Sequence, residues 1–442
     1  MADSNILIDD LTYLTSLSSF GTGGRYPANG LSQQWNKLRN RRKLYDQGRL
    51  PEGKELPKVL PNWYRKITSF WADVLYANPP SIDSEDKDVR EFITRFKDKV
   101  LSTARVIALN ASIEGTGVFV VRADGRLGGV RATNWFPIVT ADDISLKTAD
   151  VIAYPFVNDP NEVTIADRIQ IQQFQDGTLT VRTHEMSAMS IGSQLSTDTE
   201  LTAMDAVIPV VHNDTGSWYG ESDYVDINTL VEEIADRLSG IKDVADKHSS
   251  PHVYLPASVV QRIDGNSIDL GETKIIPIEE NDETPGYLTW DASLSAQFQQ
   301  VDKVQAQLFI MSNLSPSLFG EQRIGSVDSG LALKRLAIPT ILRLQHLRQA
   351  HEQALKRVIV AMKDSMLVGG DTDLPGFNDD DIQITWPELL RDSEKEAVET
   401  EIMKLGAGLT TREESISRIE GLGPMEAEKA ASQAQMIDPD SS

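Results

Sequence analysis

The stretch that decides the fold is GESDYVDINTLVEEIADRLSGIKDVADKHSS, residues 220–250. Apolar side chains recur in it at helical spacing, which predicts an amphipathic helix. They are Ile227, Leu230, Ile234, Leu238 and Ile241. A second helix of similar length is predicted at residues 291–313, and the runs HVYLP, SIDL and TKIIPIEE between the two helices are typical of strands. Two helices that flank a small β insert predict a hairpin-like excursion from a larger body.

The residues before this stretch predict that the body mixes helix and sheet. WYRKITSFWADVLYANPP, residues 63–80, and the following residues 86–115 both have helical periodicity. From residue 117 to residue 212 the pattern changes to short β-branched and aromatic runs separated by Gly, Asp and Asn. One of the separators, QDG at 175–177, is typical of a hairpin turn. The predicted fold class is therefore α+β.

The C-terminal side predicts one long helix and a helical tail. The long helix runs from residue 331 to about residue 366, and Pro339 inside it is expected to remove one backbone hydrogen bond and kink the axis. Three further helices are predicted after it from their start signals. These signals are the capping boxes Ser393 with Glu396 and Thr411 with Glu414, and the GLGP turn at 421–424.

Charge is distributed unevenly along the chain. The formal net charge of -23 argues against a general nucleic-acid-binding surface, which requires positive charge. Two segments are basic nevertheless: residues 37–49, with six basic residues and one acid, and residues 334–363, with seven basic residues and one acid. The tail from residue 371 is strongly acidic. The basic arm at 37–49 could bind an acidic partner, a neighbouring copy of the chain or DNA, and the sequence does not rank these.

The motifs of the common enzyme classes are missing from the sequence. In RIGSVDSGLALKRLAIP, residues 323–339, Gly325 and Gly330 bracket four residues as in a phosphate-binding P-loop. The lysine comes late, however, at Lys334, with no hydroxyl residue after it and no strand before the loop. The sequence has no cysteine, and Pro251 prevents a helical pair of His248 and His252, which are four residues apart. We therefore expect no catalytic residue, no metal site and no cofactor.

Membrane insertion and secretion are not expected either. No apolar run approaches the roughly 20 residues that span a bilayer. The start MADSNILIDDLTYL has no basic region before its apolar residues, as a signal peptide would have.

The order of these elements resembles that of the portal proteins of tailed bacteriophages, the head-to-tail connector rings, of siphovirus-like type. The resemblance covers residues from about 62 to 423. Three stretches carry it: GESDYVDINTLVEEIADRLSG, SPSLFGEQRIGSVDSGLALKRL and ITWPELLRDSEKEAVETEIMKLGAGLTTREESI. Within them the matching residues are Ser329, Gly330, Ala332 and Leu333 at the start of the long helix, the pair Trp386 and Pro387, and Gly408, Leu409 and Thr410.

The resemblance implies a portal-type subunit in a ring, usually of twelve copies, at one capsid vertex. Double-stranded DNA would be packaged and ejected through the ring. The implied parts are an N-terminal arm and linker (1–61), an α/β wing (62–221), a stem helix (222–249), a β-containing clip (250–290), a second stem helix (291–314), a tunnel loop (315–330), a long kinked helix with the return to the wing (331–392) and a helical crown (393–442).

The implied partners follow from these parts. The clip would dock the terminase large subunit and later the head-completion adaptor, and the wing would meet the major capsid and scaffold proteins. The protein would lie in the virion after assembly in the host cytoplasm, with no membrane partner. The alternatives are another ring-forming scaffold protein and, as the less favoured hypothesis, an acidic enzyme of unknown type.

The resemblance also implies that the tunnel loop lies next to the DNA that moves through the ring. Arg323 and Lys334 are expected to touch the phosphate backbone. The small residues Gly325, Ser326, Ser329 and Gly330 would make the loop mobile, and Pro339 would act as a hinge. Alternatively, Arg323 is an ordinary solvated residue, Lys334 and Arg335 pair with acids of a neighbouring subunit, and Pro339 marks a static kink.

Overall fold

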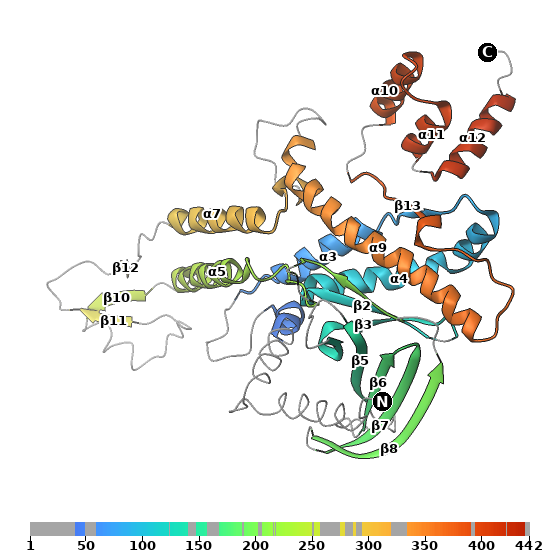
Figure 1. Ribbon diagram of the computed structural model, residues 1–442. Helices are drawn as coiled ribbons and strands as arrows, with labels where there is room; N and C mark the ends of the chain where they lie inside the picture. Colours follow the sequence, from blue (N-terminus) through green and yellow to red (C-terminus); the bar gives the residue numbers. More distant parts are fainter. Residues whose placement is uncertain are drawn as a thin grey trace. The chain divides into compact units, whose positions relative to one another are not determined.

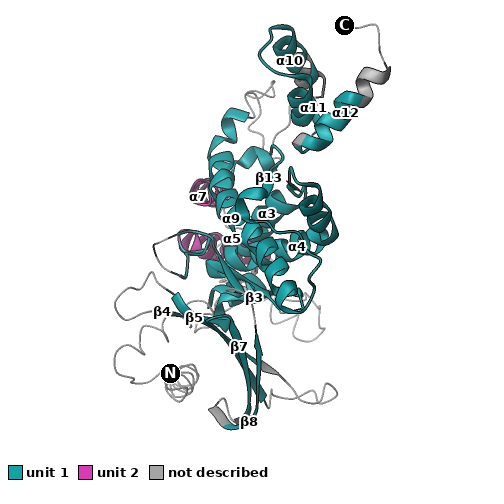
Figure 2. Cartoon of the chain, turned by 45° about the vertical axis from the view of Figure 1, so that its right-hand side comes forward, with its two compact units in different colours: residues 1–50, 64–225, 313–442 teal, residues 51–63, 226–312 magenta. Residues whose placement is uncertain are grey.

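A computed structural model describes most of the chain outside the first 39 residues. The described residues are 40–48, 59–122, 124–139, 147–156, 168–187, 190–201, 206–214, 216, 218–249, 252–256, 275–278, 286–288, 294–319, 334–389, 394–420 and 422–437. They belong to two compact units (Figures 1 and 2). Unit 1 comprises Met1–Leu50, Tyr64–Val225 and Asn313–Ser442, and unit 2 comprises Pro51–Trp63 and Asp226–Ser312. None of the described helices is long and apolar enough to cross a membrane.

Two helices predicted from the sequence begin the body. They are α3, Trp63–Tyr76, and α4, Lys87–Glu114. Asp86 caps α4 by accepting hydrogen bonds from the backbone N–H groups of Asp88 and Val89, as N-cap aspartates do. Gly115 ends α4 with a φ of 90°, and a Cβ atom there would lie 2.0 Å from the Gly220 carbonyl oxygen. Only glycine fits this position, so the segment before residue 221 can approach the end of α4.

The described residues of unit 1 form three antiparallel sheets. One has the order β3-β2-β9, and α4 and the long helix α9, Ile338–Val368, pack against its central strand β2. The second is a five-stranded meander, β4-β5-β6-β7-β8, and β1 pairs with β13 in the third. Their strands are β1 Ser81–Asp83, β2 Thr116–Val121, β3 Leu127–Arg131, β4 Trp135–Val139, β5 Lys147–Phe156, β6 Arg168–Gln175, β7 Thr178–Ser187, β8 Ser190–Leu201, β9 Val207–Val211 and β13 Gln383–Thr385. The α+β class is thus confirmed.

The meander contains one strand that the sequence pattern missed. The predicted hairpin between β6 and β7 is present, with positive φ at both Asp176 and Gly177, as a type I′ turn requires. The next strand, β8, has the polar sequence SIGSQLSTDTEL, and its residues 193–201 are all exposed. It pairs with β7 through backbone hydrogen bonds and gains no buried face, so it lacks the apolar alternation that marks a strand in a sequence.

Unit 2 contains the two helices and the small sheet expected from residues 220–313. Its helices are α5, Asn228–Ser249, and α7, Ser295–Met311, which pack on each other. Its sheet has the order β11-β10-β12, with β10 His252–Pro256, β11 Ile275–Ile278 and β12 Gly286–Leu288. β10 is parallel to β11 and antiparallel to β12. The predicted strand SIDL lies outside the described residues.

The tail forms the three predicted helices, α10 Glu394–Gly406, α11 Arg412–Glu420 and α12 Pro424–Ile437. Thr411 caps α11 by accepting a 3.2 Å hydrogen bond from the Glu414 backbone N–H. Gly408, with a φ of 68°, lies in the turn that closes α10. Ser393, the expected cap of α10, lies outside the described residues.

The long helix differs from the prediction at its start. Helix α9 spans Ile338–Val368, after a separate helical turn at 334–336 and a break at Ala337. Pro339 therefore lies in the first turn of α9, whereas the sequence predicted it in the interior of a helix that starts at residue 331. A proline is well tolerated in a first turn, because the backbone N–H that it lacks would have no intrahelical acceptor there.

Candidate functional site

The residues singled out around the long loop fall into two groups. Arg323, Gly325, Ser326, Ser329 and Gly330 lie outside the described residues. Lys334 lies in a helical turn before α9 and is half-buried, and Pro339 is exposed in the first turn of α9. What the structure describes is therefore the base of the loop, that is, the residues up to 319 and from 334 onward.

A single hydroxyl group holds the two ends of this base together. Thr340, which is fully buried in α9, donates a 2.8 Å hydrogen bond to the carbonyl oxygen of Asn313 and accepts a 3.0 Å bond from the N–H of Ser315. Asn313 has a positive φ of 56°, which turns the chain into the loop. The side chains of Leu314 and Ala337 are buried beside them. The loop thus starts and ends at a fixed point of the body.

The outgoing arm of the loop is attached to α3. Residues Pro316–Phe319 form a short 3-10 helix, η2. The ring of Phe319 lies 5.2 Å from that of Phe70, and the ammonium of Lys66 lies 5.5 Å above the same ring. An aromatic contact and a cation–π contact therefore hold the loop as far as residue 319.

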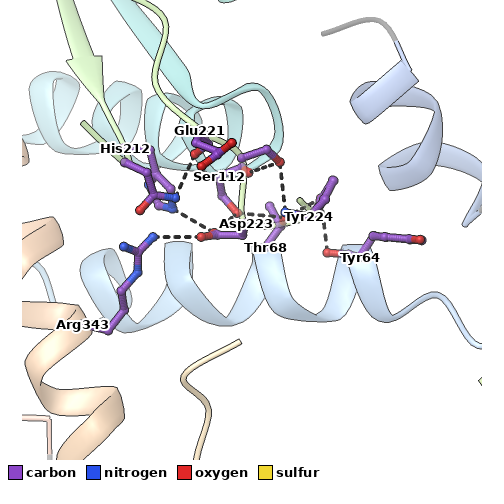
Figure 3. Close-up of polar contacts among 10 residues, drawn as sticks. Tyr64, Thr68, Ser112, His212, Glu221, Asp223, Tyr224 and Arg343 are labelled. Atoms are coloured by element: carbon purple, nitrogen blue, oxygen red, sulfur yellow. Dashed lines mark hydrogen bonds and ion pairs between the residues drawn. The ribbon is translucent and has the colours of Figure 1, made fainter. Parts of the chain in front are cut away.

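Close to the loop base, α9 is tied to the segment that leads into unit 2. Arg343 donates a 2.9 Å hydrogen bond from Nη2 to Asp223 Oδ1 (Figure 3). The other carboxylate oxygen, Oδ2, lies 2.8 Å from His212 Nε2 and accepts a 2.7 Å bond from Ser112 Oγ. The Asp223 carboxylate thus has partners from α4, from the end of β9 and from α9, and its side chain is only 8% exposed.

A second layer of hydrogen bonds extends this network to α3. Thr68 contacts both Ser112 Oγ, at 3.0 Å, and the hydroxyl of Tyr224, at 2.5 Å. The Tyr224 hydroxyl also donates to the carbonyl oxygen of Tyr64, and the two tyrosine rings meet edge to face (Figure 3). Residues 222–224, the last turn before unit 2, are therefore anchored to α3 and α4 as well as to α9.

The electrostatics of the network favour charge on Asp223. Burial by itself would raise the pKa of Asp223, but the nearby His212 and Arg343 and the hydrogen bonds from His212 and Ser112 outweigh it, and the pKa falls to about 2. Close by on α9, burial lowers the pKa of His351 to about 3, so its ring is neutral and shares a 2.8 Å hydrogen bond with the Tyr76 hydroxyl. Next to α9, Asp223 is therefore charged and paired, and the His351 imidazole is neutral.

Part of the basic arm, residues 37–49, makes contacts with the rest of its own chain. Residues 40–47 are helical, and the buried Arg41 donates a 3.0 Å hydrogen bond to the carbonyl oxygen of Glu114 at the end of α4. Arg42 donates to Asn110 Oδ1 and lies 3.7 Å from Asp46. These two arginines dock the arm on α4, which weakens the interpretation of the arm as a free surface for DNA.

The Trp386–Pro387 pair is also explained by its contacts. The guanidinium of Arg348 on α9 lies 5.4 Å above the Trp386 ring and donates a 2.6 Å hydrogen bond to the Pro387 carbonyl oxygen. The Tyr76 ring meets the Trp386 ring edge to face, with the two centroids 5.9 Å apart. The pair thus fixes the chain to the middle of α9 before it enters the tail.

The contacts described above position helices and chain segments. Among the described residues, no group of three or more His, Asp or Glu side chains could hold a metal ion. The sequence pattern did not reveal that Thr340, Asp223 and Arg343 hold parts of the body together, because their partners lie far away in the sequence. The one local signal is ESDY at 221–224, a polar run directly before a strongly amphipathic helix.

Comparison with known proteins identifies the family of this architecture. The family model described as phage portal protein, SPP1 Gp6-like, matches residues 31–440 of the 442-residue chain. No curated protein matches the chain.

Proposed function

The chain belongs to the SPP1 Gp6-like family of phage portal proteins, and we propose that its unit 2 forms the stem and clip of a twelve-subunit ring. As a portal protein it is a structural channel component of the viral capsid and not an enzyme, with a role in DNA packaging and head-to-tail connection. The finer assignment gives α5 and α7 to the stem, residues 250–290 to the clip, the body to the wing and residues 393–442 to the crown.

The observation that carries this assignment is the compactness of unit 2. Residues 226–312 leave the body once, form α5, a three-stranded sheet and α7, and return. α5 buries Val231 and Ile234, α7 buries Val301 and Leu308, and the two helices pack on each other. Two packed helices with a small sheet between them in the chain suit a part that projects from a ring toward other proteins.

The charge of the two helices suits a channel that DNA slides through. Each phosphate neutralised by Lys or Arg adds salt-dependent affinity, so a strongly basic lining would retain the DNA. α5 has five acidic and three basic residues, and α7 has one of each along with five glutamines. Arg237 and Lys242 on α5 are moreover paired with Glu233 and Asp246. We therefore place α5 and α7 beside the channel as a surface with few unpaired cations.

The proposed docking role of the clip is tested by removing it. Replacing residues 250–290 with a short Gly-Ser linker should leave rings visible by electron microscopy and abolish binding of the terminase large subunit and the head-completion adaptor. A chain that ends at residue 392 is the control, since it lacks the crown and should still bind terminase. Clip-less rings that capture terminase as well as intact rings do would refute the docking role.

The proposed DNA contacts are Arg323 and Lys334 in the loop that Thr340 closes at its base. Rings with Arg323→Ala and Lys334→Ala should package or retain less DNA. The salt dependence of retention should become shallower by about one unit of slope for each phosphate that is no longer neutralised. Arg126→Ala, which removes an arginine 76% exposed in the β2–β3 turn, is the matched control. If loop variants and control retain DNA equally, neither residue touches the DNA backbone.

The remaining loop residues have supporting roles in this proposal. Gly325, Ser326, Ser329 and Gly330 give the loop small side chains beside the DNA, and Pro339 allows α9 to change direction at its first turn. Rings with Pro339→Ala should package more slowly if Pro339 is a hinge. Unchanged packaging would indicate a static turn.

A further inference from the structure

A cavity of about 530 Å³ lies in unit 1, lined by the β2–β3 hairpin and by one face of the five-stranded sheet. The sheet contributes side chains from β5, β6, β7 and β8. This volume is within the range of about 300–1,000 Å³ that is usual for binding pockets. Neither the stem, the clip, the loop nor the crown includes the cavity, so the proposed function gives it no role.

The cavity contains a cation that lacks an anionic partner. Arg122, directly after β2, contributes a half-buried guanidinium group. The contact that the structure describes for this group is with the ring of Phe174, whose centroid lies 6.0 Å away. Among the described residues, no carboxylate forms an ion pair with Arg122. Burial lowers the pKa of Arg122, because its charge has lost water without gaining an anion. An anionic group in the cavity would compensate this loss.

Two acids also line the cavity, and neither is bound to Arg122. Asp124 is paired with Arg126 in the hairpin. Glu200 lies on the edge strand β8, in register across β7 with Phe174 of β6. Neighbouring strands are about 4.8 Å apart, so Glu200 is roughly 10 Å across the sheet from the position of Phe174. This distance is about one Debye length at 0.1 M salt, so Glu200 repels an anion beside Arg122 only weakly.

The sheet side of the cavity presents polar and apolar side chains next to each other. The side-chain amide of Gln172 donates a 3.0 Å hydrogen bond to the Tyr154 hydroxyl and a 2.6 Å bond to Gln170 Oε1. Gln172 is only 3% exposed, and its Oε1 has no hydrogen-bond partner among the described residues. Leu179 and Val181 of β7 add an apolar strip. The cavity therefore suits a peptide segment that carries a carboxylate next to apolar side chains.

We propose that this cavity binds residues 6–14 of the same chain, ILIDDLTYL, with the carboxylate of Asp9 or Asp10 on Arg122. Residues 1–39 lie outside the part of the chain that the structure describes. In their sequence, the two adjacent aspartates stand between apolar residues, and residues 1–24 contain no Lys or Arg. Adjacent residues of an extended segment point to opposite sides, so one of the two aspartates faces Arg122 whichever side the segment presents.

Covalent attachment favours this segment over a segment of another protein. Arg41 fixes the helix at 40–47 to the carbonyl oxygen of Glu114, which lies two residues before β2, Thr116–Val121. The six residues of β2 cover about 20 Å up to Arg122. Residues 15–39 would span about 38 Å even as a helix, so the linker is long enough. A linker that spans its gap gives the attached segment an effective concentration of about 1 mM.

The absence of cysteine from the sequence makes a direct cross-linking test possible in the full-length protein. Thr12→Cys introduces a thiol near the two aspartates. Gly128→Cys introduces a second thiol in the cavity wall, where a Cβ atom would meet no other atom within 4 Å. In the control pair, Gly240→Cys on α5, where a Cβ atom has equal space, replaces Gly128→Cys. With a short bismaleimide, and after correction for the labelling rate of each single cysteine, the Gly128 pair should cross-link within one chain at least about fivefold faster than the control pair.

The contact with Arg122 is tested in the same Gly128 pair. Arg122→Gln should lower the rate of cross-linking within one chain about fivefold, because it removes the charge that binds the aspartate. The double variant Asp9→Asn and Asp10→Asn should have the same effect. It leaves the body unaltered, so it keeps the test decisive if Arg122→Gln fails to fold.

Three results would overturn the inference. The first is an equal rate in the Gly128 pair and the control pair. The second is a rate that the Asp9→Asn and Asp10→Asn substitutions leave unchanged. The third is a product that consists mainly of two linked chains, seen as a dimer in a denaturing gel, because the segment in the cavity would then belong to a second copy. None of these results bears on the proposed ring.

Discussion

The Asp223 network and helix α10 both bury a carboxylate, but they differ in where their apolar side chains lie. Around Asp223, partners from α4, β9 and α9 enclose the carboxylate, and large apolar side chains such as Tyr64 and Trp71 are buried in α3. In α10, Glu401 accepts a hydrogen bond from Arg418 on α11, while the neighbouring Ile402 is 62% exposed. A buried charge is tolerated only with partners in place, and an apolar side chain contributes to stability only as far as it is removed from water. The body is therefore held together by buried side chains, whereas α10 leaves large apolar side chains in contact with solvent.

The largest effect should come from removing the centre of the network. Asp223→Ala leaves the partly buried Arg343 without its counter-ion and the buried His212 ring without its hydrogen-bond partner, and we expect the free energy of unfolding to fall by about 3–5 kcal/mol. Asp73→Ala is the matched control, because it breaks an aspartate–arginine pair, with Arg105, in which both side chains are about half exposed. The control should cost less than about 1 kcal/mol. Urea unfolding of both variants measures the difference, and similar losses would show that the network is not what holds α9 to residues 221–224.

The next effect tests Glu114, a buried acid with incomplete hydrogen bonding. Its Oε2 accepts a 3.1 Å bond from the Thr133 N–H, and its Oε1 has no hydrogen-bond partner among the residues that the structure describes. Burial raises the pKa of Glu114 to about 7, against the lowering effects of the Thr133 bond and of Arg42.

The sign of the pH dependence follows from this raised pKa. Below about pH 4.5 the carboxyl is protonated in both the folded and the unfolded chain and has no effect. Between about pH 4.5 and pH 7 the unfolded chain gives up this proton while the folded chain still holds it. The folded chain therefore loses about 3 kcal/mol of stability over this range. Glu114→Gln should therefore unfold at a higher temperature than the wild type at pH 8 and at nearly the same temperature at pH 4.5. Glu413→Gln, at an exposed glutamate, should follow the wild type at both. An unchanged difference across this pH range would contradict the role given to Glu114.

A smaller effect is expected at the loop base. Thr340→Val removes the hydroxyl and leaves the buried Ser315 N–H and the Asn313 carbonyl oxygen without their partner, at a cost of about 1–3 kcal/mol. Thr340→Ser keeps the hydroxyl and is the control, with only the loss of a methyl group. Thermal unfolding compares the two, and a serine variant destabilised as much as the valine variant would show that the hydroxyl does not hold the loop base.

The smallest effect on folding is expected in α10. Ile402→Asn replaces an exposed side chain that contacts little of its own chain, so the stability of the dissociated subunit should change by less than about 0.5 kcal/mol. Urea unfolding of dissociated subunits measures this change. A loss of 2 kcal/mol or more would show that Ile402 packs within its own chain and would remove the contrast with the body.

The sequence predicted the elements whose side chains repeat with a local period. The helices α3, α4, α5 and α7 were expected at close to their observed bounds, because their apolar faces recur along the chain. Strand β8 was not predicted, because it is exposed from residue 193 to its end. The start of the long helix was predicted too early in the sequence, because apolar periodicity does not reveal the break at Ala337. The contacts at the base of the loop and around Asp223 could not be predicted from the sequence for a different reason. Thr340 lies 27 residues from Asn313, and Asp223 lies 120 residues from Arg343, so only the folded chain brings these partners together.

The most direct test of the proposed function is a cryo-electron microscopy reconstruction of the purified protein. We predict a closed ring, about twelve-fold, with a central channel, with α5 and α7 of every subunit beside the channel and residues 250–290 at one end of it. A compact monomer, or a ring in which α5 and α7 lie on the outer rim away from the channel, would contradict this prediction.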